Sequence, residues 1–402
     1  MSSSRAQELI ALLDNIQESD YGDDSDSHDG DRVAVAEAAR RLLARLETPF
    51  ERAWRLSWIN SNIHMAVQIV LDVGIWEAWY LSKRHEISLL ELHALARIPC
   101  DLMLLRRLLR LLAAEHVIRE LGEDQYGATS FSQALGQPGE AVAQTILSGT
   151  HHGLDSSRNL PQFLARTAYA EPLDPGNSSY MDLTSERLGM FERCRANPDY
   201  QASFIGFMRG LTAYKLDWTK IYDTDILMGD FDTNGEVPLL VDVGGAHGVD
   251  VERLLSRYPN LPGGKLILQD TPDVIAMAKV NEKIAVMHHD FFTAQPVEGA
   301  RAYFMHAIIH DWDDSDAGRI LSNTAVAMKK GYSKLLLYES VLVSTGATLY
   351  QSVSDVSLMH LISAADRTEA RWSELLRAAG FKVCKIWQHP SSLESVIEAE
   401  LA

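Results

Sequence analysis

One segment, LLVDVGGAHGVDVERLL at residues 239–255, constrains the fold more than any other part of this sequence. An apolar run at 239–243 leads into the turn Gly244-Gly245-Ala246-His247-Gly248, and a helical pattern follows. Glycines allow a backbone to approach a ligand closely, and the first turn of a helix offers unpaired N–H groups. The spacing differs from the G-x-G-x-x-G of dinucleotide sites. The segment therefore predicts a buried strand, a ligand-binding turn and a helix.

Further short apolar runs follow this strand, and helical stretches separate the first five runs. Such alternation predicts a mainly parallel sheet that is covered by helices on both faces, which is a doubly wound α/β domain. The seven predicted strands lie at 239–243, 266–269, 285–288, 302–305, 334–338, 381–387 and 395–398.

The first third of the chain has a helical pattern instead. Residues 5–17 predict a short amphipathic helix, and the acidic stretch 18–31 predicts a solvated linker. From residue 32 to residue 135 the pattern is helical and contains many large apolar residues. So many apolar side chains on helices indicate either a buried core or a dimer interface. The order helix, turn, helix and hairpin within 88–128 is typical of a winged helix, here interpreted as a structural or dimerisation element. The large apolar residues concerned are Trp54, Trp58, Ile63, Val67, Ile69, Val70 and Trp76.

These shifts in pattern predict four parts of the chain. Residues 1–47 comprise the N-terminal helix, the acidic linker and a further helix. Residues 48–135 form the helical, winged-helix-like dimerisation domain. Residues 136–230, interrupted by several prolines, form a connecting region of helices and loops, and residues 231–402 form the α/β domain.

Charge and cysteine content exclude some partners and sites. The 402 residues include 37 Lys and Arg against 55 Asp and Glu, a net charge of −18, which argues against nucleic acid or an anionic membrane as partner. The separated Cys100, Cys194 and Cys384 are typical of a reducing compartment and exclude a thiolate zinc site. Acids stand where a signal peptide needs an apolar run, so we expect a soluble cytoplasmic protein.

Acidic residues end two of the predicted strands. Asp270 follows the second strand, 26 residues after Gly244, and a carboxylate there can accept both hydroxyls of an adenosine ribose. Asp290 follows the third strand and precedes Phe291, a pairing that suits the amino group and the face of an adenine. Carboxyl ends of parallel strands meet at one edge, so together these residues predict a nucleoside site.

Two histidines follow the fourth strand. His306 and His310 have the spacing of a metal pair on a helix, but no third ligand follows, so we expect no metal. A lone histidine is more often structural than catalytic. Two acids could orient His310, however: Glu339 at the end of the fifth strand and Asp366 in SAADRTEARW. A carboxylate fixes an imidazole in the tautomer that accepts a proton.

The segments LVDVGGAHG, QDTPDVI, HHDFF, HDWDD, LLLYES and DRTEARWSELLRAAGF, in this order and spacing, resemble the S-adenosylmethionine-dependent O-methyltransferases of small molecules. The similarity is to the caffeic-acid-type plant enzymes and to fungal enzymes acting on polyketides or alkaloids. It extends from about Thr48 to the C-terminus, because RRLLRLLAAEHVIRELGEDQYGATSFSQAL also resembles their N-terminal winged-helix segment.

The resemblance implies a cofactor, S-adenosylmethionine, and residues that contact it. Gly244 would contact its methionine part, Asp270 its ribose, and Asp290 with Phe291 its adenine. Trp312 would pack near the adenine. His306 stands where relatives carry Lys or Arg near the cofactor.

The resemblance also implies catalytic residues and an assembly. His310 aligns with the general base of the family, and Glu339 and Asp366 align with the acids that position it. Asp366 replaces a Glu, which shortens its reach by one methylene, and Ala246 replaces a glycine of the turn. The family pattern implies an intertwined homodimer. Residues at substrate-lining positions are His151, His152, Phe204, Phe207, Met208, Met359 and Ile362.

We therefore expect methyl transfer to a phenolic or enolic hydroxyl of an aromatic, polyketide or alkaloid metabolite. A phenol has a pKa of about 10, so a base with a pKa near 7 need only assist its deprotonation. An alternative is a pericyclase or dehydratase of the same fold that uses the bound cofactor as an electrostatic aid. Such proteins tend to lose the base histidine, which this sequence retains as His310.

Overall fold

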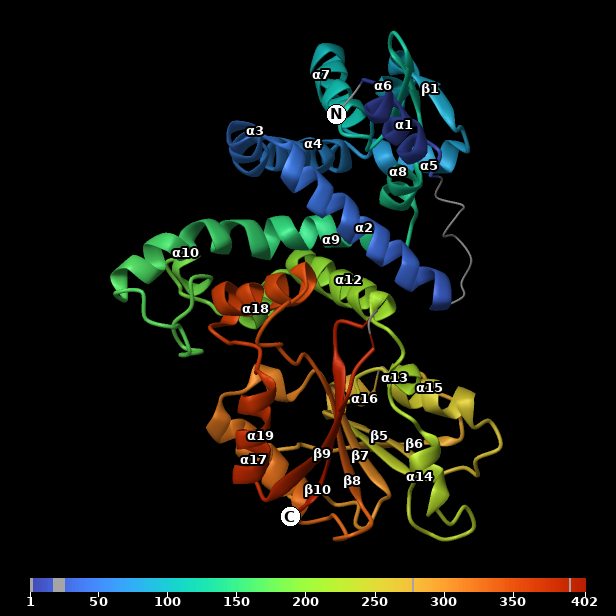
Figure 1. The fold of residues 1–402 in the computed structure, drawn as a ribbon, viewed down its shortest axis with the longest axis vertical. Coiled ribbons are helices and arrows are strands. Elements are labelled where there is room, and N and C mark those ends of the chain that lie inside the picture. The colour runs from blue at the N-terminus through green and yellow to red at the C-terminus, as the bar shows by residue number, and fades with distance from the viewer. Residues whose placement is uncertain (1–2, 17–25, 277, 390–391) are drawn as a thin grey trace. The chain divides into compact units, whose positions relative to one another are not determined.

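The computed structural model describes residues 3–16, 26–276, 278–389 and 392–402 (Figure 1). The chain forms two compact units, Met1–Ala143 and Gln144–Ala402. The acidic stretch 18–31 differs in part from the expected linker, because a helix begins at Asp26, while residues 18–25 lie outside the described residues. Among the described residues, no helix combines the length and the apolar character that a membrane-spanning segment needs.

The N-terminal unit opens with a series of helices. Thr48 begins the third of them, because its hydroxyl accepts a hydrogen bond from the Glu51 N–H while the Glu51 carboxylate accepts one from the Thr48 N–H. The segments are α1 (Ser3–Asp14), α2 (Asp26–Leu46), α3 (Pro49–Trp54), the π-helical turn η2 (Arg55–Ile59), α4 (Asn60–Asp72) and α5 (Ile75–Ser82).

The apolar residues of these helices divide between core and surface. Val67, Val70 and Trp76 are buried within the unit, so the core interpretation holds for them. Trp54 and Trp58 are 49% and 61% exposed. Their indole rings stack on each other, with centroids 6.0 Å apart.

A small antiparallel sheet completes this unit. Helices α6 (Leu89–Leu95) and α7 (Leu102–Ala114) precede the hairpin of β2 (Arg119–Gly122) and β3 (Gln125–Gly127), which is the predicted order of elements. Strand β1 (Glu86–Ser88) pairs with β3, and the strand order is β1-β3-β2. Helix α8 (Ser130–Gly136) follows.

Helices and turns connect this unit to the large sheet. Proline is tolerated in the first turn of a helix, and Pro198 lies in the first turn of α12, directly after the capping residue Asn197. The elements are α9 (Ala141–Ser148), the π-helical turn η3 (Gly149–Gly153), α10 (Leu154–Arg166), the 3₁₀ turn η4 (Met181–Leu183), α11 (Met190–Ala196), α12 (Pro198–Tyr214), α13 (Trp218–Ile221) and α14 (Asp225–Gly229).

The seven predicted strands are confirmed and form one sheet in the order β6-β5-β4-β7-β8-β10-β9. Neighbours from β6 to β8 run parallel, whereas β10 is antiparallel to both β8 and β9. The strands are β4 (Leu240–Val243), β5 (Leu266–Asp270), β6 (Ile284–His288), β7 (Ala302–His306), β8 (Lys334–Glu339), β9 (Phe381–Trp387) and β10 (Ser395–Leu401).

Helices cover both faces of this sheet, as the alternating pattern predicts (Figure 1). The strand order reverses between β4 and β7, and open α/β sheets bind ligands beyond the carboxyl ends of strands at such a switch point. Gly244 and His306 lie at these two strand ends. The covering helices include α15 (Val249–Arg257), α16 (Pro272–Ile275), α17 (Asp314–Ala325), α18 (Leu349–Ile362) and α19 (Glu369–Ala378).

Candidate active site

The glycine turn after β4 has the close backbone geometry that the sequence predicts. Gly244 has φ +74°, a left-handed conformation that strains any other residue, and a Cβ atom there would also lie 2.7 Å from the Ile308 Cδ1 atom. Ala246, which replaces a family glycine, has φ +50°. Its N–H donates a hydrogen bond to the Asp270 carboxylate at 2.9 Å. The turn and the end of β5 are thus joined directly.

Asp270 faces the glycine turn from the carboxyl end of β5. One carboxylate oxygen accepts from the Ala246 N–H, and the other accepts from the Thr271 N–H at 2.7 Å. Each oxygen has a further lone pair, so the carboxylate can still accept hydrogen bonds from a ribose.

An aromatic cluster lies beside this turn. Phe291 approaches Gly244, where a Cβ atom would lie 3.7 Å from the phenylalanine ring. The Trp312 ring meets the rings of Phe291 and Phe292 edge-on, with centroids 6.0 and 4.7 Å apart. Asp290 caps the loop by accepting a hydrogen bond from the Phe292 N–H at 2.9 Å. The structure therefore brings three predicted cofactor residues together and adds Phe292, which sequence reasoning missed.

Asp242 is a second residue that sequence reasoning missed. It is buried in β4, and within the described residues neither of its carboxylate oxygens has a hydrogen-bond partner. Burial, and then the charge of Asp250, raise the pKa of Asp242 well above its usual range. A Cβ atom on Gly245 would lie 2.4 Å from this carboxylate. The feature that could have identified Asp242 in the sequence is an acidic residue within the apolar run LLVDV.

These features fit S-adenosylmethionine. The left-handed backbone of Gly244 favours glycine, which lets the turn approach a bound group closely, and the Asp270 carboxylate beside it can still accept hydrogen bonds from a ribose. Asp270, Phe291 and Trp312 lie at the same edge of the sheet. Within the described residues, no group of three His, Cys, Asp or Glu side chains is arranged to hold a metal ion.

His306 lies in a buried ion cluster at the end of β7. Its Nδ1 atom is 2.6 Å from the Asp250 carboxylate, and its Nε2 atom is 3.0 Å from the Glu394 carboxylate. Lys215 donates to the other Glu394 oxygen at 2.6 Å, and Arg253 donates to Asp250 at 2.9 Å. The sequence predicted His306 as a cofactor contact, but both of its ring nitrogens are occupied by protein carboxylates.

The charges of this cluster stabilise one another. Burial alone would lower the pKa of His306, but Glu394 and Asp250 outweigh it and raise the pKa to about 9. Burial alone would raise the pKa of Glu394, but Lys215 and His306 lower it to about 2. His306 is therefore a cation at neutral pH.

His310 lies in the 3₁₀ turn η5 (Ile309–Asp311) that follows β7. Its Nδ1 atom is 3.3 Å from one Glu339 oxygen, and the other Glu339 oxygen accepts hydrogen bonds from the backbone N–H groups of Ile308 and Ile309. Its Nε2 atom is 3.3 Å from the Asp311 carboxylate, which sequence reasoning missed. Glu339 is fully buried and locked by the backbone, so it can hold the imidazole in one orientation.

The surrounding acids control the titration of His310. Burial lowers the pKa of His310, but the charges of Glu339, Asp311 and Asp366, in decreasing order, outweigh it, and the pKa is raised. Burial also raises the pKa of Glu339, while the positive charge of His310 opposes this rise.

Asp366 differs from the expectation. No ion pair or hydrogen bond joins it to His310 among the described residues, and neither of its oxygens has a hydrogen-bond partner there. It acts on His310 through its charge alone. The Asp side chain is one methylene shorter than the Glu that the resemblance implies at this position.

Arg367, the next residue, fixes the segment that carries His310. Its guanidinium donates to the backbone oxygens of Ile309 and Trp312, at 2.9 and 2.7 Å, and to the Asp314 carboxylate. Its side chain is buried. The two carbonyls that flank His310 are thus held by one cation, which sequence reasoning also missed.

The histidine pair of the connecting region is engaged in packing. His152 is buried, with its ring nitrogens 2.9 Å from the Tyr180 hydroxyl and 3.2 Å from the Tyr200 carbonyl oxygen. Burial lowers the pKa of His152. His151 lies 2.9 Å from the Ser203 hydroxyl and stacks on Tyr200. Their predicted contact with substrate stays a prediction.

The apolar substrate-lining candidates lie on two helices. They are half-buried residues of α12 and α18, and the rings of Tyr214 on α12 and Tyr350 on α18 lie 5.9 Å apart. Their contact with substrate also stays a prediction. The residues are Phe204, Phe207, Met208, Met359 and Ile362.

Comparisons with known proteins show the family and the fold to which this chain is similar. Residues 187–382 match the family described as the O-methyltransferase domain. The chain is 42% identical over 403 residues to the O-methyltransferase ATR12 of Stachybotrys chlorohalonatus, with all of both chains covered. It is 27% identical to LepI in complex with SAM, with a TM-score of 0.86 over 99% of this chain and 100% of LepI. A structure described as a pericyclic reaction enzyme gives a TM-score of 0.85 at 26% identity, over 99% and 100% of the chains.

Proposed function

Because the chain belongs to the S-adenosylmethionine-dependent O-methyltransferases, we propose that it methylates a phenolic or enolic hydroxyl of an aromatic, polyketide or alkaloid metabolite. The observation that carries this proposal is the imidazole of His310 facing the buried Glu339 carboxylate at 3.3 Å. This pair is built to accept a proton from a hydroxyl at the carboxyl end of the sheet.

When bound, S-adenosylmethionine supplies a methyl group that its sulfonium already activates. Gly244, Asp270, Asp290 and Phe291 would hold it. The protein must then orient the acceptor and remove one proton from it.

His310 would perform that second task. Its Nδ1 atom lies 3.3 Å from the Glu339 carboxylate, which favours the neutral tautomer with the proton on Nδ1. In that tautomer the lone pair of Nε2, the nitrogen beside Asp311, would accept the hydroxyl proton. As the O–H bond breaks and the N–H bond forms, the oxygen gains the electron density that it needs as a nucleophile. Glu339 stabilises the imidazolium that results.

One assay with two readouts tests the proposal. Candidate acceptors are incubated with wild type and with His310→Ala, and both modified acceptor and S-adenosylhomocysteine are measured. We expect equal amounts of the two products in wild type. In the variant, we expect turnover to be lower by roughly 10²–10⁴. Full activity of His310→Ala contradicts the mechanism.

The alternative, a pericyclase or dehydratase, is favoured by one observation: the chain resembles a pericyclic reaction enzyme over its whole length. In that case the same assay gives an altered acceptor without S-adenosylhomocysteine, although the reaction still requires bound cofactor. A fold does not determine a function, so this result would favour the pericyclase or dehydratase and contradict methyl transfer.

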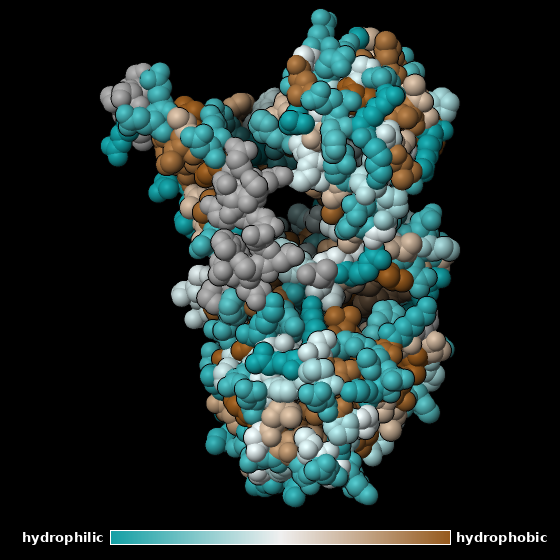
Figure 2. All heavy atoms as spheres, turned by 90° about the vertical axis from the view of Figure 1, so that its right-hand side faces the viewer, coloured by the Kyte–Doolittle hydropathy of each residue, from teal (hydrophilic) through white to brown (hydrophobic). Residues whose placement is uncertain are grey.

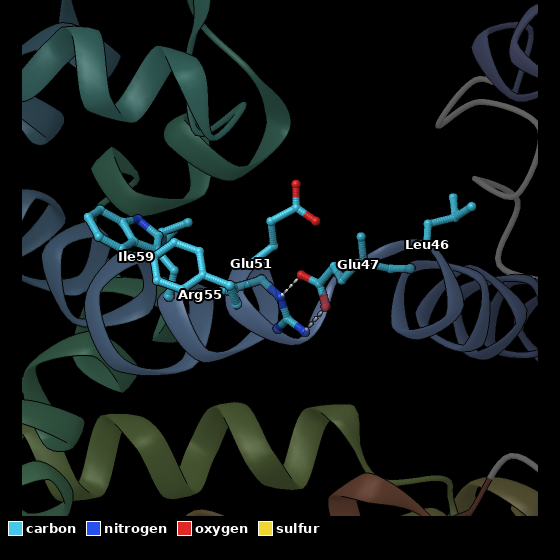
Figure 3. Close-up of a pocket in the computed structure, with 8 residues that line it drawn as sticks. Leu46, Glu47, Glu51, Arg55 and Ile59 are labelled. Atoms are coloured by element: carbon cyan, nitrogen blue, oxygen red, sulfur yellow. Dashed lines mark hydrogen bonds and ion pairs between the residues drawn. The ribbon is translucent and has the colours of Figure 1, made fainter.

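The N-terminal unit supports a further proposal, that the protein is a homodimer. Phe50, Trp54 and Trp58 are exposed, and their rings follow one another along α3 and η2. Phe50 and Trp54 also line an open hollow of about 590 Å³ (Figure 3), whose wall contains the ion pair between Arg55 and Glu47. Exposed apolar side chains also appear among the polar ones on the surface in Figure 2. A second copy of the chain would cover this aromatic face.

Replacement of the aromatic face tests the dimer. We expect Trp54→Glu with Trp58→Glu to convert a dimer of wild type into a folded monomer, because two charges cannot be buried there unpaired. Light scattering at micromolar concentration measures the mass. Arg5→Glu on α1 is the control for an added negative charge. A wild-type monomer contradicts the proposal.

A further inference from the structure

Two tyrosine rings meet between α12 and α18 in the C-terminal unit. The rings of Tyr214 and Tyr350 have centroids 5.9 Å apart, with an angle of 47° between their planes. The two residues are 48% and 42% exposed. Parallel stacked rings would cover one face of each other, whereas tilted rings leave more of their faces open. The pair therefore offers aromatic surface to a further ring.

Tyr214 continues the face of α12 that carries predicted substrate-lining residues. Aromatic or apolar residues recur on this helix at spacings of three and four, namely Phe204, Phe207, Leu211 and Tyr214. Residues with this spacing share one face of a helix. The Phe204 ring, near one end, meets the His152 ring edge-on at 6.0 Å, and Tyr214 is the last residue of the helix at the other end. Sequence reasoning missed Tyr214.

The segment after Tyr214 is bound to the strand that holds the candidate base. The backbone oxygen of Leu216 accepts a hydrogen bond from the Tyr338 hydroxyl at 2.6 Å. Tyr338 directly precedes Glu339 at the end of β8, and Glu339 faces His310. The C-terminal end of α12 is therefore fixed beside the catalytic part of the sheet.

Tyr350 is close to the same strand along the chain. Strand β8 ends at Glu339, and α18 begins ten residues later, at Leu349. Leu349 and Val353 lie next to Tyr350 on α18, one helical turn apart, and they are 51% and 54% exposed. Exposed apolar residues that gather in this way are typical of a binding surface.

We propose that Tyr214 and Tyr350 form an aromatic clamp, which binds an extended planar ring system of the acceptor by stacking. The proposal rests on the proposed function, since it assigns the acceptor to the class of fused aromatic rings. The clamp holds the part of the acceptor that is remote from the hydroxyl facing His310. Stacked aromatic rings contribute to binding beyond the apolar area that they bury.

Two phenols that differ in one ring test the clamp. 2-Naphthol has two planar fused rings, whereas the second ring of 5,6,7,8-tetrahydro-2-naphthol is saturated and puckered. Both are uncharged at pH 7, because the pKa of a phenol is about 10. Calorimetry measures their binding to the full chain saturated with S-adenosylhomocysteine. We expect 2-naphthol to bind about tenfold more tightly, because only its second ring can stack.

Variants of the two tyrosines locate the effect. Tyr214→Leu and Tyr350→Leu remove a ring but keep an apolar side chain, so each should reduce the preference for 2-naphthol, and the double variant should abolish it. Tyr214→Phe and Tyr350→Phe keep the rings and should keep the preference. Tyr169→Leu, at a tyrosine of the same unit that is 74% exposed, is the matched control. Unchanged affinity for S-adenosylhomocysteine verifies that each variant is folded.

Three results would overturn the clamp. The first is equal binding of the two phenols to wild type, or no binding of 2-naphthol at millimolar concentration. The second is a preference for 2-naphthol that persists in the double variant. The third is a change of mass of the double variant in light scattering, which would assign the rings to an interface between copies of the chain. Binding does not require turnover, so failure of the clamp is distinguished from failure of methyl transfer, which the two-readout assay measures.

Discussion

Two histidines at the end of β7, four residues apart, lie in charge clusters that are built differently. His306 has a carboxylate on each ring nitrogen, and Lys215 completes the cluster through Glu394. His310 has the locked Glu339 on one nitrogen, while the other faces Asp311, whose side chain is 38% exposed. We call the first cluster enclosed, because Asp250 and Glu394 are both buried, and the second open, because Asp311 reaches the surface.

This difference separates a structural cation from a candidate base. Carboxylates on both nitrogens raise the pKa of His306 to about 9, so it keeps its proton at neutral pH and cannot accept another. His310 has a raised pKa as well, but its Nε2 atom faces Asp311, whose side chain is partly exposed. A histidine with one fixed nitrogen can pass a proton, whereas one with both nitrogens fixed holds its neighbours in place.

Replacement of His310 by glutamine should mainly lower turnover, and replacement of His306 should mainly lower stability. These are the largest effects that we expect. His310→Gln should lower turnover by roughly 10²–10⁴, with little change in stability or in cofactor affinity. His306→Gln should lower stability and reduce turnover less. Steady-state kinetics, urea unfolding and calorimetry with S-adenosylmethionine measure the three quantities. Equal losses of turnover would mean that the two clusters do not differ in function.

The fold and one of these two histidine sites, that of His310, could be predicted from the sequence. Strands have a local apolar pattern, and parallel strands bring their carboxyl ends together, so Gly244, Asp270 and His310 were predictable. The partners of His306 were not, because Lys215 and Glu394 are 91 and 88 residues away from it in sequence. Pairs that form only in three dimensions leave no periodic signal.

The N-terminal unit shows a second limit. Trp54 and Trp76 belong to the same apolar stretch, but Trp54 is 49% exposed and Trp76 is buried. Hydropathy reports that a side chain prefers to be covered, and it does not report what covers it. Asp366 shows a third limit, because the resemblance implies a contact with His310, and no ion pair or hydrogen bond joins the two side chains among the described residues.

The enclosed cluster should make stability depend on pH in two windows. The pKa of His306 rises from 6.5 to about 9 on folding, so its contribution is complete below pH 6.5 and is lost as the pH rises to 9. A shift of this size corresponds to about 3 kcal/mol. The pKa of Glu394 falls from 4.5 to about 2, so its contribution is present above pH 4.5 and is lost toward pH 2.

Urea unfolding between pH 3 and pH 9 measures this dependence. We expect the greatest contribution of the cluster between pH 4.5 and pH 6.5 and a fall on either side. His306→Gln should flatten the alkaline side, and Asp316→Asn should leave the curve unchanged. An alkaline fall that persists in His306→Gln would assign it to another group.

Removal of the locked acid should affect the open cluster more modestly. Glu339→Gln keeps the shape but removes the charge that faces Nδ1, and we expect about a tenfold loss of maximal turnover because the imidazolium is less stable. The same change lowers the pKa of His310, so the rise of turnover with pH should begin at a lower pH than in wild type. A rate profile against pH shows both effects. An unshifted profile would mean that Glu339 does not control the titration of His310.

The smallest effect should come from the acids that act on His310 without holding it. Asp311→Asn and Asp366→Asn each remove a negative charge, so each should lower the pKa of His310 and move the rise in turnover to lower pH. The shifts should decrease in the order Glu339, Asp311 and Asp366, because the charges act on His310 in that order. Maximal turnover should fall little in Asp366→Asn, since no ion pair with His310 is lost. A loss as large as that of Glu339→Gln would show that Asp366 orients the imidazole directly, and the two clusters would then both be closed.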